Sequence, residues 1–591
     1  MDEIFFGLAE QYDQGSIPQI SINAKGTVLE VHKNEEGFSL YYRVGTLNKA
    51  TVEWGASHHY DDGNSPACAI NRNNVAVEVH KNQLGSTLYY HVGTVSGKSV
   101  EWSKSREYDS GIQPNVAMND DGIVVEVHKT QSPFSNGLYY HVGQVKDDKI
   151  DWHSSNKYDS GALPQVAIDN NGNVVEVHQS ESKSEVWYHV GRITGSKIDF
   201  GGSVEFGSGT APSVALAENG VVITTWTRND STLMQRTGRL EGGKIAWQGD
   251  AVEFDDGEYS SSAVANDTAI QVHPSETIKY GLWYSTSLLT SRSSWMQNRL
   301  NTLGQRPLSE LTLPASHDSG MYKDGIAILG KTQDLSIYGQ LNAGIRYFDL
   351  RPKWTGSKFI IYHGPIDGPD LSEVLDDIQK FCREGHRELA ILKLSHFDNI
   401  DGNTYSKLLD QIENVIGIWL VQNIPGGKRL ADVTLNEYVN KGPAMLMAVD
   451  GSLPVEHPRQ GFWVYRDWDS GQPEQGQLNV YDKYSDTTDF DKMKKDQSHK
   501  FESFDGRCKN DPSVPCDLFL LSWTLTPVTG VWYVSKPANR SLGQAMVALP
   551  LTNQYGKRIN MLYVDYVEYA RVTDVAIIQN ETSNATVGEM R

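Results

Sequence analysis

The chain has few cysteines, no long apolar run and a deficit of basic residues. Its 591 residues include only four cysteines, and no CxxC pair or Cys/His cluster indicates a zinc site. No run of about 18 apolar residues occurs, so the sequence predicts no transmembrane helix. The 53 Lys and Arg residues stand against 74 Asp and Glu residues, a formal net charge of −21. This charge argues against nucleic acid as the main partner, and it requires any contact with an anionic membrane to be local and apolar.

The four cysteines are too few for a disulfide framework in a chain of this length. Cys508 and Cys516 flank the short polar segment KNDPSVP and could pair, and the sequence leaves this open. Cys68 and Cys382 lie in different halves, and we expect both to be buried thiols. The first ten residues, MDEIFFGLAE, have no basic start and only a short apolar stretch, so they do not have the form of a signal peptide.

A six-fold repeat dominates residues 1–288. Its clearest unit is an aromatic residue followed by Asp, any residue and Gly. Successive copies begin 48 or 50 residues apart, at Tyr12, Tyr60, Tyr108, Tyr158, Phe206 and Phe254, and the copy at Phe206 is degenerate because Gly replaces the Asp. Each copy offers about four short strands with alternating side chains, separated by Gly, Asn and Asp turns. Because a period of 40–50 residues with four strands is typical of a propeller blade, we expect an all-β six-bladed propeller over residues 1–288.

The ends of the repeat predict how the ring closes. The sixth copy stops after GLWYSTSLL and lacks its last strand, whereas the N-terminal EIFF places Phe6 in the register of Trp54 and Trp102. We therefore expect EIFF to complete the last blade, which would remove the open sheet edges.

The repeated His, Tyr and Trp side chains have two interpretations, and both remain open. They can tie strands together and stack between blades. Alternatively, they can line equivalent sugar pockets, because aromatic rings with Asp and His neighbours suit carbohydrate rings. The repeat resembles the lectin-like propellers of bacteria and fungi in general form, without a specific sugar motif.

From residue 289 the repeat ends, and strands alternate with helices up to residue 591. The expected strands are ELTLPAS, IRYFDLR, FIIYHG, ELAILKLSHF, PAMLMAVDG, LFLLSWTLT and INMLYVDYV. The expected helices are DLSEVLDDIQKFCREG, TYSKLLDQIENVIG and TLNEYVNKG. This alternation predicts an α/β barrel of the TIM type, in which catalytic side chains lie at the C-terminal ends of the strands. The chain is therefore expected to be a multidomain protein.

Three short segments of the second half carry chemistry: LTLPASHDSG (311–320), IRYFDLR (345–351) and YHG (362–364). They place His317, Asp318, Asp349, Arg351 and His363 within about fifty residues. Cleavage of a phosphodiester by an internal hydroxyl needs a base, an acid and positive charge on the phosphorane. Two imidazoles can supply the base and the acid, and a guanidinium fork can hold two phosphate oxygens.

The order and setting of these segments resemble the X-type catalytic region of bacterial phosphatidylinositol-specific phospholipase C, over most of residues 295–580. The resemblance implies that His317 is the general base for the inositol 2-hydroxyl and that His363 is the general acid. It also implies that Asp318 couples to the acid histidine. Asp349 would orient the site, and Arg351 would contact phosphate.

Further segments extend the resemblance. LYVDY matches the segment whose aspartate partners the base histidine, here Asp565, which would orient that imidazole. VYDKYSD matches an Asp-x-Tyr segment, so Asp482 would bind an inositol hydroxyl. Tyr484 would either stack on the inositol ring or pack in the core or on the surface. The family's strand lysine falls at Ser395, and Lys393, two residues earlier on the same strand face, can substitute for it.

The family's arginine positions bear on two questions, namely how the headgroup is bound and whether the site uses a metal. The family's arginine after the next strand falls near Val449 or Asp450 here, and Arg459 or Arg466 could compensate. Calcium-dependent members of the superfamily carry an acidic residue where Arg351 stands. Because a fixed guanidinium would repel calcium, we expect a site without metal and without any other cofactor.

The resemblance therefore implies a phosphoric diester hydrolase or lyase. It would cleave phosphatidylinositol or a glycosylphosphatidylinositol anchor and give diacylglycerol and a cyclic inositol phosphate. The propeller would direct it to a membrane surface that carries such lipids, or to glycans. We expect a secreted protein whose export route is not visible in the sequence. Two alternatives stay open: a phosphodiesterase for another headgroup, and a glycan-binding lectin with a degenerate barrel.

Two apolar segments are candidates for membrane contact. KDGIAILG contains Ile326, Ile328 and Leu329 shortly after the expected base, and it is either a membrane-probing loop at the barrel mouth or a buried lid. Trp532, within TGVWYV, is a second candidate of the same kind.

Overall fold

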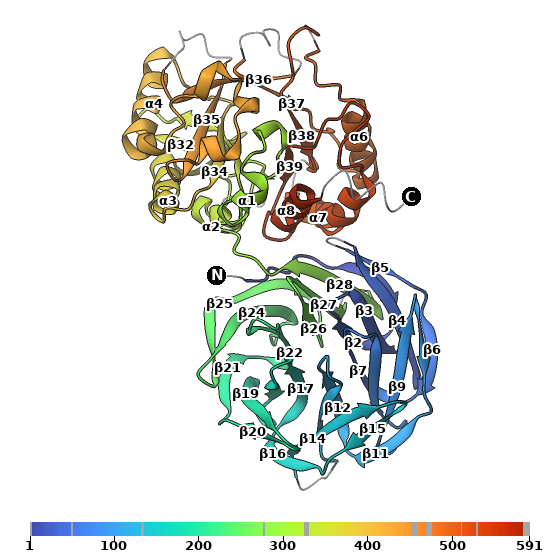
Figure 1. The fold of residues 1–591 in the computed structure, drawn as a ribbon. Helices are drawn as coiled ribbons and strands as arrows, with labels where there is room; N and C mark the ends of the chain where they lie inside the picture. The colour runs from blue at the N-terminus through green and yellow to red at the C-terminus, as the bar shows by residue number, and fades with distance from the viewer. Residues whose placement is uncertain are drawn as a thin grey trace. The chain divides into compact units, whose positions relative to one another are not determined.

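The computed structural model describes residues 3–48, 51–131, 135–275, 278–323, 330–451, 459–468, 476–509, 511–527 and 530–582. The chain divides into two compact units, Met1–Thr290 and Ser291–Arg591 (Figure 1). No helix among the described residues is both long and apolar enough to span a bilayer.

The first unit is built from six antiparallel sheets that follow the sequence repeat. The first sheet contains β2 (Ser16–Ile22), β3 (Thr27–Lys33), β4 (Ser39–Asn48), β5 (Thr51–Trp54) and β6 (His58–Asp62). The second contains β7 (Asn64–Ile70), β8 (Val75–Lys81), β9 (Thr87–Ser96), β10 (Ser99–Trp102) and β11 (Arg106–Ser110). The third contains β12 (Ile112–Met118), β13 (Ile123–Lys129), β14 (Gly137–Lys146), β15 (Lys149–Trp152) and β16 (Asn156–Ser160).

The remaining three sheets repeat this plan with small changes. The fourth contains β17 (Ala162–Ile168), β18 (Asn173–Gln179), β19 (Glu185–Thr194), β20 (Lys197–Phe200) and β21 (Val204–Ser208). The fifth contains β22 (Thr210–Leu216), β23 (Val221–Thr227), β24 (Thr232–Glu241) and β25 (Lys244–Asp256). The sixth contains β26 (Ser261–Ala265), β27 (Thr268–Pro274), β28 (Gly281–Leu288) and β1 (Glu10–Gln14).

The six sheets are arranged in a cycle. The first strands of neighbouring sheets contact each other in the order β2, β7, β12, β17, β22 and β26, and β26 returns to β2. Figure 1 shows the sheets succeeding one another around this unit.

Two apolar faces on each sheet hold neighbouring sheets together. Alternation along β13 sends Val124 to one face and Val125 and Val127 to the other. Val124 packs in one core cluster with Val79 of the preceding sheet. Val125 and Val127 pack in another cluster with Val174 of the following sheet. Each interface between adjacent sheets is therefore a layer of buried aliphatic side chains, and this burial stabilises the unit.

The repeated aromatic residues pack between adjacent sheets. The hydroxyl of Tyr60, on the first sheet, donates to Glu78 Oε1 of the second at 2.8 Å. The Tyr60 ring lies 5.7 Å from that of Trp102, also on the second sheet. The same contact recurs between Tyr108 and Trp152, at 5.2 Å. Tyr60 and Tyr108 thus tie the first sheet to the second and the second to the third through a hydrogen bond and a ring contact.

The strand that closes the cycle differs from the sequence expectation. β1 pairs with β28, whereas EIFF forms only an isolated bridge at its first residue. Side chains occupy the backbone amides of this segment: Phe5 N donates to Ser287 Oγ at 2.6 Å, and Phe6 N donates to Gln235 Oε1 at 3.0 Å. Amides that are bonded to side chains cannot also form a strand ladder, so the next segment of the chain supplies the closing strand.

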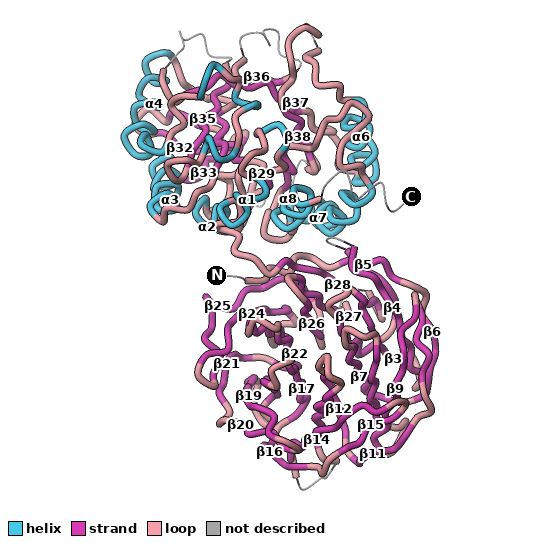
Figure 2. Tube along the Cα trace, in the orientation of Figure 1, coloured by secondary structure: helices cyan, strands magenta, loops and turns pink. Residues whose placement is uncertain are grey.

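The second unit contains a closed barrel of eight parallel strands. In order around the barrel these are β29 (Leu313–Ser316), β30 (Tyr347–Leu350), β34 (Leu389–Leu394), β35 (Ala444–Asp450), β36 (Phe462–Asp467), β37 (Leu478–Asp482), β38 (Leu518–Ser522) and β39 (Met561–Val564). Helices lie outside the strands (Figure 2). They are α1 (Leu300–Leu303), α2 (Ile337–Asn342), α3 (Leu371–Arg383), α4 (Gly402–Ile416), α5 (Leu435–Tyr438), α6 (Phe490–Ser503), α7 (Val531–Ala548) and α8 (Val572–Glu581).

One expected barrel strand lies outside the barrel. FIIYHG forms β32 (Phe359–His363) in an antiparallel three-stranded sheet with β31 (Pro352–Trp354) and β33 (Ile366–Asp370). The turn before it, where Thr355 N donates to Lys358 O, is far too short for the crossover that a parallel strand requires. The barrel instead uses β36 and β37, whose sequences FWVYRD and LNVYD were not expected to be strands. Helix α5 is shorter than TLNEYVNKG, and α6, α7 and α8 were not predicted.

All four cysteines are buried free thiols. This confirms the expectation for Cys68 and Cys382. Cys508 and Cys516 lie close together beside the bridge between Arg507 and Pro515, but they form no disulfide in this structure.

Candidate active site

The expected catalytic residues meet at the C-terminal ends of the barrel strands. His317 directly follows β29, Arg351 directly follows β30, and Asp565 directly follows β39. Because the strands are parallel and the barrel is closed, these ends surround one mouth. His363 reaches the same place from β32, the strand outside the barrel.

His317 lies between two carboxylates. Its Nδ1–H donates to Asp565 Oδ1 at 2.7 Å, and its Nε2 lies 3.3 Å from Asp318 Oδ2. Burial alone would lower the pKa of His317, but the charges of Asp318 and Asp565 outweigh it and raise the pKa to about 9. Burial raises the pKa of Asp565. Nδ1 is therefore fixed as a donor, and Nε2 faces Asp318.

Asp318 is the centre of the group. Its Oδ2 lies 3.4 Å from His363 Nε2 as well as 3.3 Å from His317 Nε2, and its Oδ1 lies 2.7 Å from Arg351 Nε. The backbone of Asp318 has φ +41°, a left-handed conformation that costs a residue with a Cβ roughly 1–2 kcal/mol. Thr332 Oγ1 donates to Asp318 O at 3.0 Å, and Gln333 Nε2 donates to His317 O at 2.9 Å. These bonds hold the strained turn in place.

Arg351 joins Asp318 to Asp349. Its Nη2 donates to Asp349 Oδ2 at 2.9 Å, and that oxygen also accepts a hydrogen bond from the Tyr563 hydroxyl at 2.7 Å. Burial works against the charged form of Asp349, but Arg351 and Lys393 outweigh it and hold its pKa well below the ordinary range. The guanidinium is therefore held in position by two carboxylates.

A second charged group lies beside Asp349. Lys393 Nζ is 2.8 Å from Asp482 Oδ2 and 3.9 Å from Asp349 Oδ1. The Tyr465 hydroxyl donates to the same Asp482 oxygen at 2.7 Å. Ser395 Oγ donates to Asp349 Oδ1 at 3.3 Å. Lys393 and Ser395 thus both lie near Asp349, on the strand face that they share.

Other expected residues lie elsewhere. Tyr484 is 58% exposed, so it is not packed in the core. Arg459 forms an ion pair with Asp410 of α4 at 2.7 Å, away from the strand ends. Arg466 follows Tyr465 on β36 and therefore points to the opposite face of the strand.

The two candidate membrane segments have different outcomes. Ile326, Ile328 and Leu329 lie outside the described residues. Trp532, on α7, is half-buried, and its ring lies 4.9 Å from Tyr566 and 4.7 Å from Tyr569. Trp532 therefore packs against its own unit.

Sequence reasoning missed Tyr465 and Tyr563. Both hydroxyls donate to site carboxylates, and the Tyr563 ring also meets the His317 ring edge-on at 5.1 Å. Tyr563 lies two residues before Asp565, so strand alternation could have placed it on the same face. Tyr465 lies on a strand that was not predicted.

The site also contains a group that could hold a metal. Ligand atoms of His317, Asp318 and Asp349 all lie within 4.8 Å of one another. However, the Arg351 guanidinium contacts both of these carboxylates and supplies a positive charge at that point. The donor set therefore does not fit a divalent ion well.

Part of the chain is similar to a protein that contains a PI-PLC X domain and to a 1-phosphatidylinositol phosphodiesterase. No protein-family model matches the chain. A stretch of 156 residues, 21% of this chain, is 28% identical to mouse (Mus musculus) PI-PLC X domain-containing protein 3 and covers 48% of it. A stretch of 98 residues, 16% of this chain, is 39% identical to 1-phosphatidylinositol phosphodiesterase of Listeria monocytogenes and covers 30% of it. The chain thus spans about half, or less, of these relatives.

Solved structures overlap with the chain at low similarity. Phosphatidylinositol-specific phospholipase C from Listeria monocytogenes has a TM-score of 0.37 at 22% identity and covers 50% of this chain and 100% of its own. Trypanosoma rangeli sialidase has a TM-score of 0.38 at 12% identity and covers 50% of this chain and 59% of its own.

Proposed function

We propose that the second unit is a metal-independent phospholipase C that cleaves phosphatidylinositol or a glycosylphosphatidylinositol anchor. The observation that carries this is the position of Asp318, which faces both imidazoles and the guanidinium at once. Two proton-transfer groups and one anion-binding fork therefore meet at one carboxylate.

The chemistry follows from these positions. The oxygen of the inositol 2-hydroxyl attacks phosphorus, and His317 Nε2 takes its proton. His363 Nε2 gives a proton to the departing diacylglycerol oxygen. Arg351 donates hydrogen bonds to the non-bridging oxygens, whose charge increases in the transition state. The products are diacylglycerol and a cyclic inositol phosphate, which slower attack by water can open.

The protonation state of His317 limits the attack by the inositol 2-hydroxyl. Its pKa of about 9 means that the imidazole carries a proton at neutral pH, and only the neutral form can act as a base. The carboxylates that raise this pKa also stabilise the imidazolium formed on proton transfer, which lowers the cost of that step. We therefore expect kcat/KM to rise with pH through the neutral range.

The headgroup is proposed to sit between the phosphate machinery and the Lys393–Asp482 pair. Asp482 can accept a hydrogen bond from an inositol hydroxyl, while exposed Tyr484 can cover the ring. Charged side chains in the site already pair with one another, and the chain is strongly acidic. Unphosphorylated inositol lipids are thus favoured over polyphosphoinositides.

The first unit is proposed to be a six-bladed propeller that directs a secreted enzyme to its target surface, by binding glycans or a membrane. The cycle of six sheets supports the propeller. Its repeated tyrosines pack between sheets, so a glycan site would need other surface residues. A glycan array with the full-length His317→Ala variant tests this part, because binding can then be read without turnover. The absence of any bound glycan would contradict the glycan role.

The enzymatic proposal is tested by one lipid panel. Phosphatidylinositol, a glycosylphosphatidylinositol-anchored protein and phosphatidylcholine are offered in parallel, with and without EDTA. We expect cleavage of the first or second substrate, unaffected by EDTA and abolished in His317→Ala and in His363→Ala. His499→Ala, at an exposed position on α6, is the matched control and should retain full activity.

Three results would overturn the proposal. Full activity in either site variant would remove the assigned base or acid. Loss of activity with EDTA that calcium restores would show a metal-dependent enzyme. Cleavage of phosphatidylcholine alone would identify another headgroup.

A further inference from the structure

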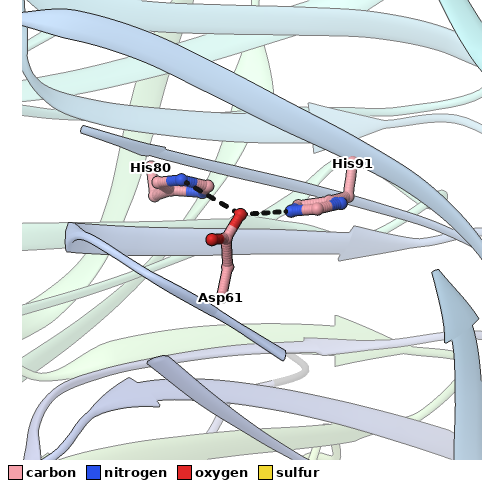
Figure 3. A group of neighbouring side chains, drawn as sticks. All are labelled: Asp61, His80 and His91. Atoms are coloured by element: carbon pink, nitrogen blue, oxygen red, sulfur yellow. Dashed lines mark hydrogen bonds and ion pairs between the residues drawn. The ribbon is translucent and has the colours of Figure 1, made fainter. Parts of the chain in front are cut away.

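Successive copies of the repeat bring one carboxylate and two imidazoles to a common point. In the best example, Asp61 lies on β6, His80 on β8 and His91 on β9 (Figure 3). Asp61 Oδ2 is 2.9 Å from His91 Nε2 and 3.7 Å from His80 Nε2. The three ligand atoms all lie within 4.8 Å of one another.

The same group occurs three times among the described residues. The other two groups are Asp109 with His128 and His141, and Asp159 with His178 and His189. In both, the carboxylate oxygen is 2.7 Å from one Nε2 and 3.8 Å from the other. All six imidazoles are buried, whereas the aspartates are 26–30% exposed. The three groups thus share one geometry and one route from solvent, through the carboxylate.

The outer nitrogen of each imidazole is already used. His80 Nδ1 lies 3.0 Å from Glu78 Oε2, and His91 Nδ1 lies 2.8 Å from Ser103 O. A carboxylate and a carbonyl only accept hydrogen bonds, so both Nδ1 atoms carry the proton. In the neutral rings, both Nε2 lone pairs then face the Asp61 carboxylate. This is the arrangement in which protein imidazoles bind metals, with the other ring nitrogen donating to an oxygen.

Three electron-pair donors that face one another repel unless a positive charge lies between them. The first copy of the repeat contains such a charge. There Asp13 and His32 hold the places of Asp61 and His80, but Arg43 stands in the place of His91. Arg43 Nη1 lies 3.3 Å from Asp13 Oδ2, so the chain supplies its own cation.

We propose that the three Asp–His–His groups are binding sites for zinc or a similar transition-metal ion, one ion per group. Zinc bonds to His nitrogen and Asp oxygen at about 2.0–2.2 Å, so tetrahedral ligand atoms are about 3.3 Å apart. The distances of 2.9 and 3.7 Å around Asp61 bracket that value. Two imidazoles and one carboxylate favour zinc over calcium or magnesium, which prefer oxygen ligands.

Each ion would join two neighbouring sheets. Asp61 belongs to the first sheet, whereas His80 and His91 belong to the second. An ion that binds all three residues stabilises the folded unit by mass action, because the unfolded chain does not bring them together. No CxxC pair or Cys/His cluster marks these groups in the sequence, because their ligands are spread over three strands and include no cysteine.

Metal binding by the full-length protein tests the proposal. After treatment with EDTA and desalting, zinc is titrated by calorimetry, and bound zinc is counted by mass spectrometry of the eluted protein. We expect the loss of one ion in each of His91→Gln, His141→Gln and His189→Gln, and of three ions in the triple variant. His59→Gln, an exposed histidine outside the groups, should leave the count unchanged.

One gain-of-site variant sharpens the test. Arg43→His places an imidazole opposite Asp13 and His32, and we expect one additional ion. Zinc should also raise the melting temperature of the wild type and not that of the triple variant, while phosphodiesterase activity in the presence of EDTA stays unchanged.

Equal zinc counts in the wild type and the triple variant would overturn the proposal. So would a wild-type protein that binds no zinc at micromolar concentrations, which would show that the groups hold protons only. If the triple variant fails to fold, the single variants still decide the outcome.

Discussion

At the residue scale, the site is a small network in which each charge has an opposite partner. Asp318 faces His317, His363 and Arg351, and Arg351 continues to Asp349. Such a network holds its groups in position without a substrate, which reduces the reorganisation needed during reaction.

The first prediction concerns Asp565. Replacing it with Asn removes the negative charge behind His317 Nδ1, so the pKa of His317 should fall from about 9. We expect kcat to fall on the order of 10²–10⁴-fold, because the imidazolium formed in the reaction loses its partner. Imidazole carbon resonances followed by NMR across pH measure the first effect, and turnover measures the second. Asp410→Asn, at an exposed position, is the control. An unchanged His317 titration would contradict the assigned contact.

The second prediction concerns pH and stability. Folding raises the pKa of His317 from 6.5 to about 9, so the fold favours the protonated ring. The resulting contribution of His317 to the free energy of unfolding is fully present below pH 6.5 and is lost as pH rises to about 9. Denaturant unfolding at a series of pH values should therefore show the wild type losing stability relative to His317→Gln across this window. Parallel curves for the two proteins would contradict the raised pKa.

The site residues that sequence could identify were those carried by short motifs. His317, Asp349 and Asp565 reach one mouth because strand ends do so in a barrel, whereas His363 reaches it from β32, outside the barrel. Tyr465 could not be found in this way. It lies on β36, and the tryptophan, arginine and aspartate of this strand obscure the apolar pattern by which a strand is predicted.

At the element scale, the glycine of the repeat has a packing role. A Cβ on Gly63 would lie 2.6 Å from His80 Cδ2 and 2.7 Å from Lys81 O. The equivalent glycines Gly111 and Gly257 meet His128 and His273 at the same 2.6 Å. The aromatic-Asp-x-Gly signature therefore lets one strand approach the histidine of the next sheet closely.

This contact gives the third prediction. Gly63→Ala should destabilise the first unit by about 1–3 kcal/mol, because the histidine or the backbone has to move. Gly202→Ala is the matched control, since no atom lies within 4 Å of its Cβ position. Thermal melting in EDTA compares the two variants. Equal melting temperatures would contradict the close approach.

Sequence predicted the long and periodic elements best. Helices α3 and α4 have clear apolar faces and end within two residues of the expected positions. FIIYHG was misassigned because an apolar run alone does not show whether its partner strand is parallel. EIFF was misassigned because its amides bond to the side chains of residues more than 200 positions away.

At the scale of the whole molecule, two units with separate cores carry separate chemistry. The first unit repeats one carboxylate–imidazole group on successive sheets, and the second concentrates different charged groups at one barrel mouth. EDTA should therefore affect the stability of the first unit and leave turnover by the second unchanged.

The most direct test of the central claim is the identity of the phosphorus product. Phosphatidylinositol is incubated with the enzyme in EDTA, and the water-soluble product is followed by ³¹P NMR from the earliest times. Attack by the inositol 2-hydroxyl predicts that a cyclic phosphodiester forms first and that any linear inositol phosphate follows later. A linear monophosphate as the initial product, or no cleavage in EDTA, would contradict the account.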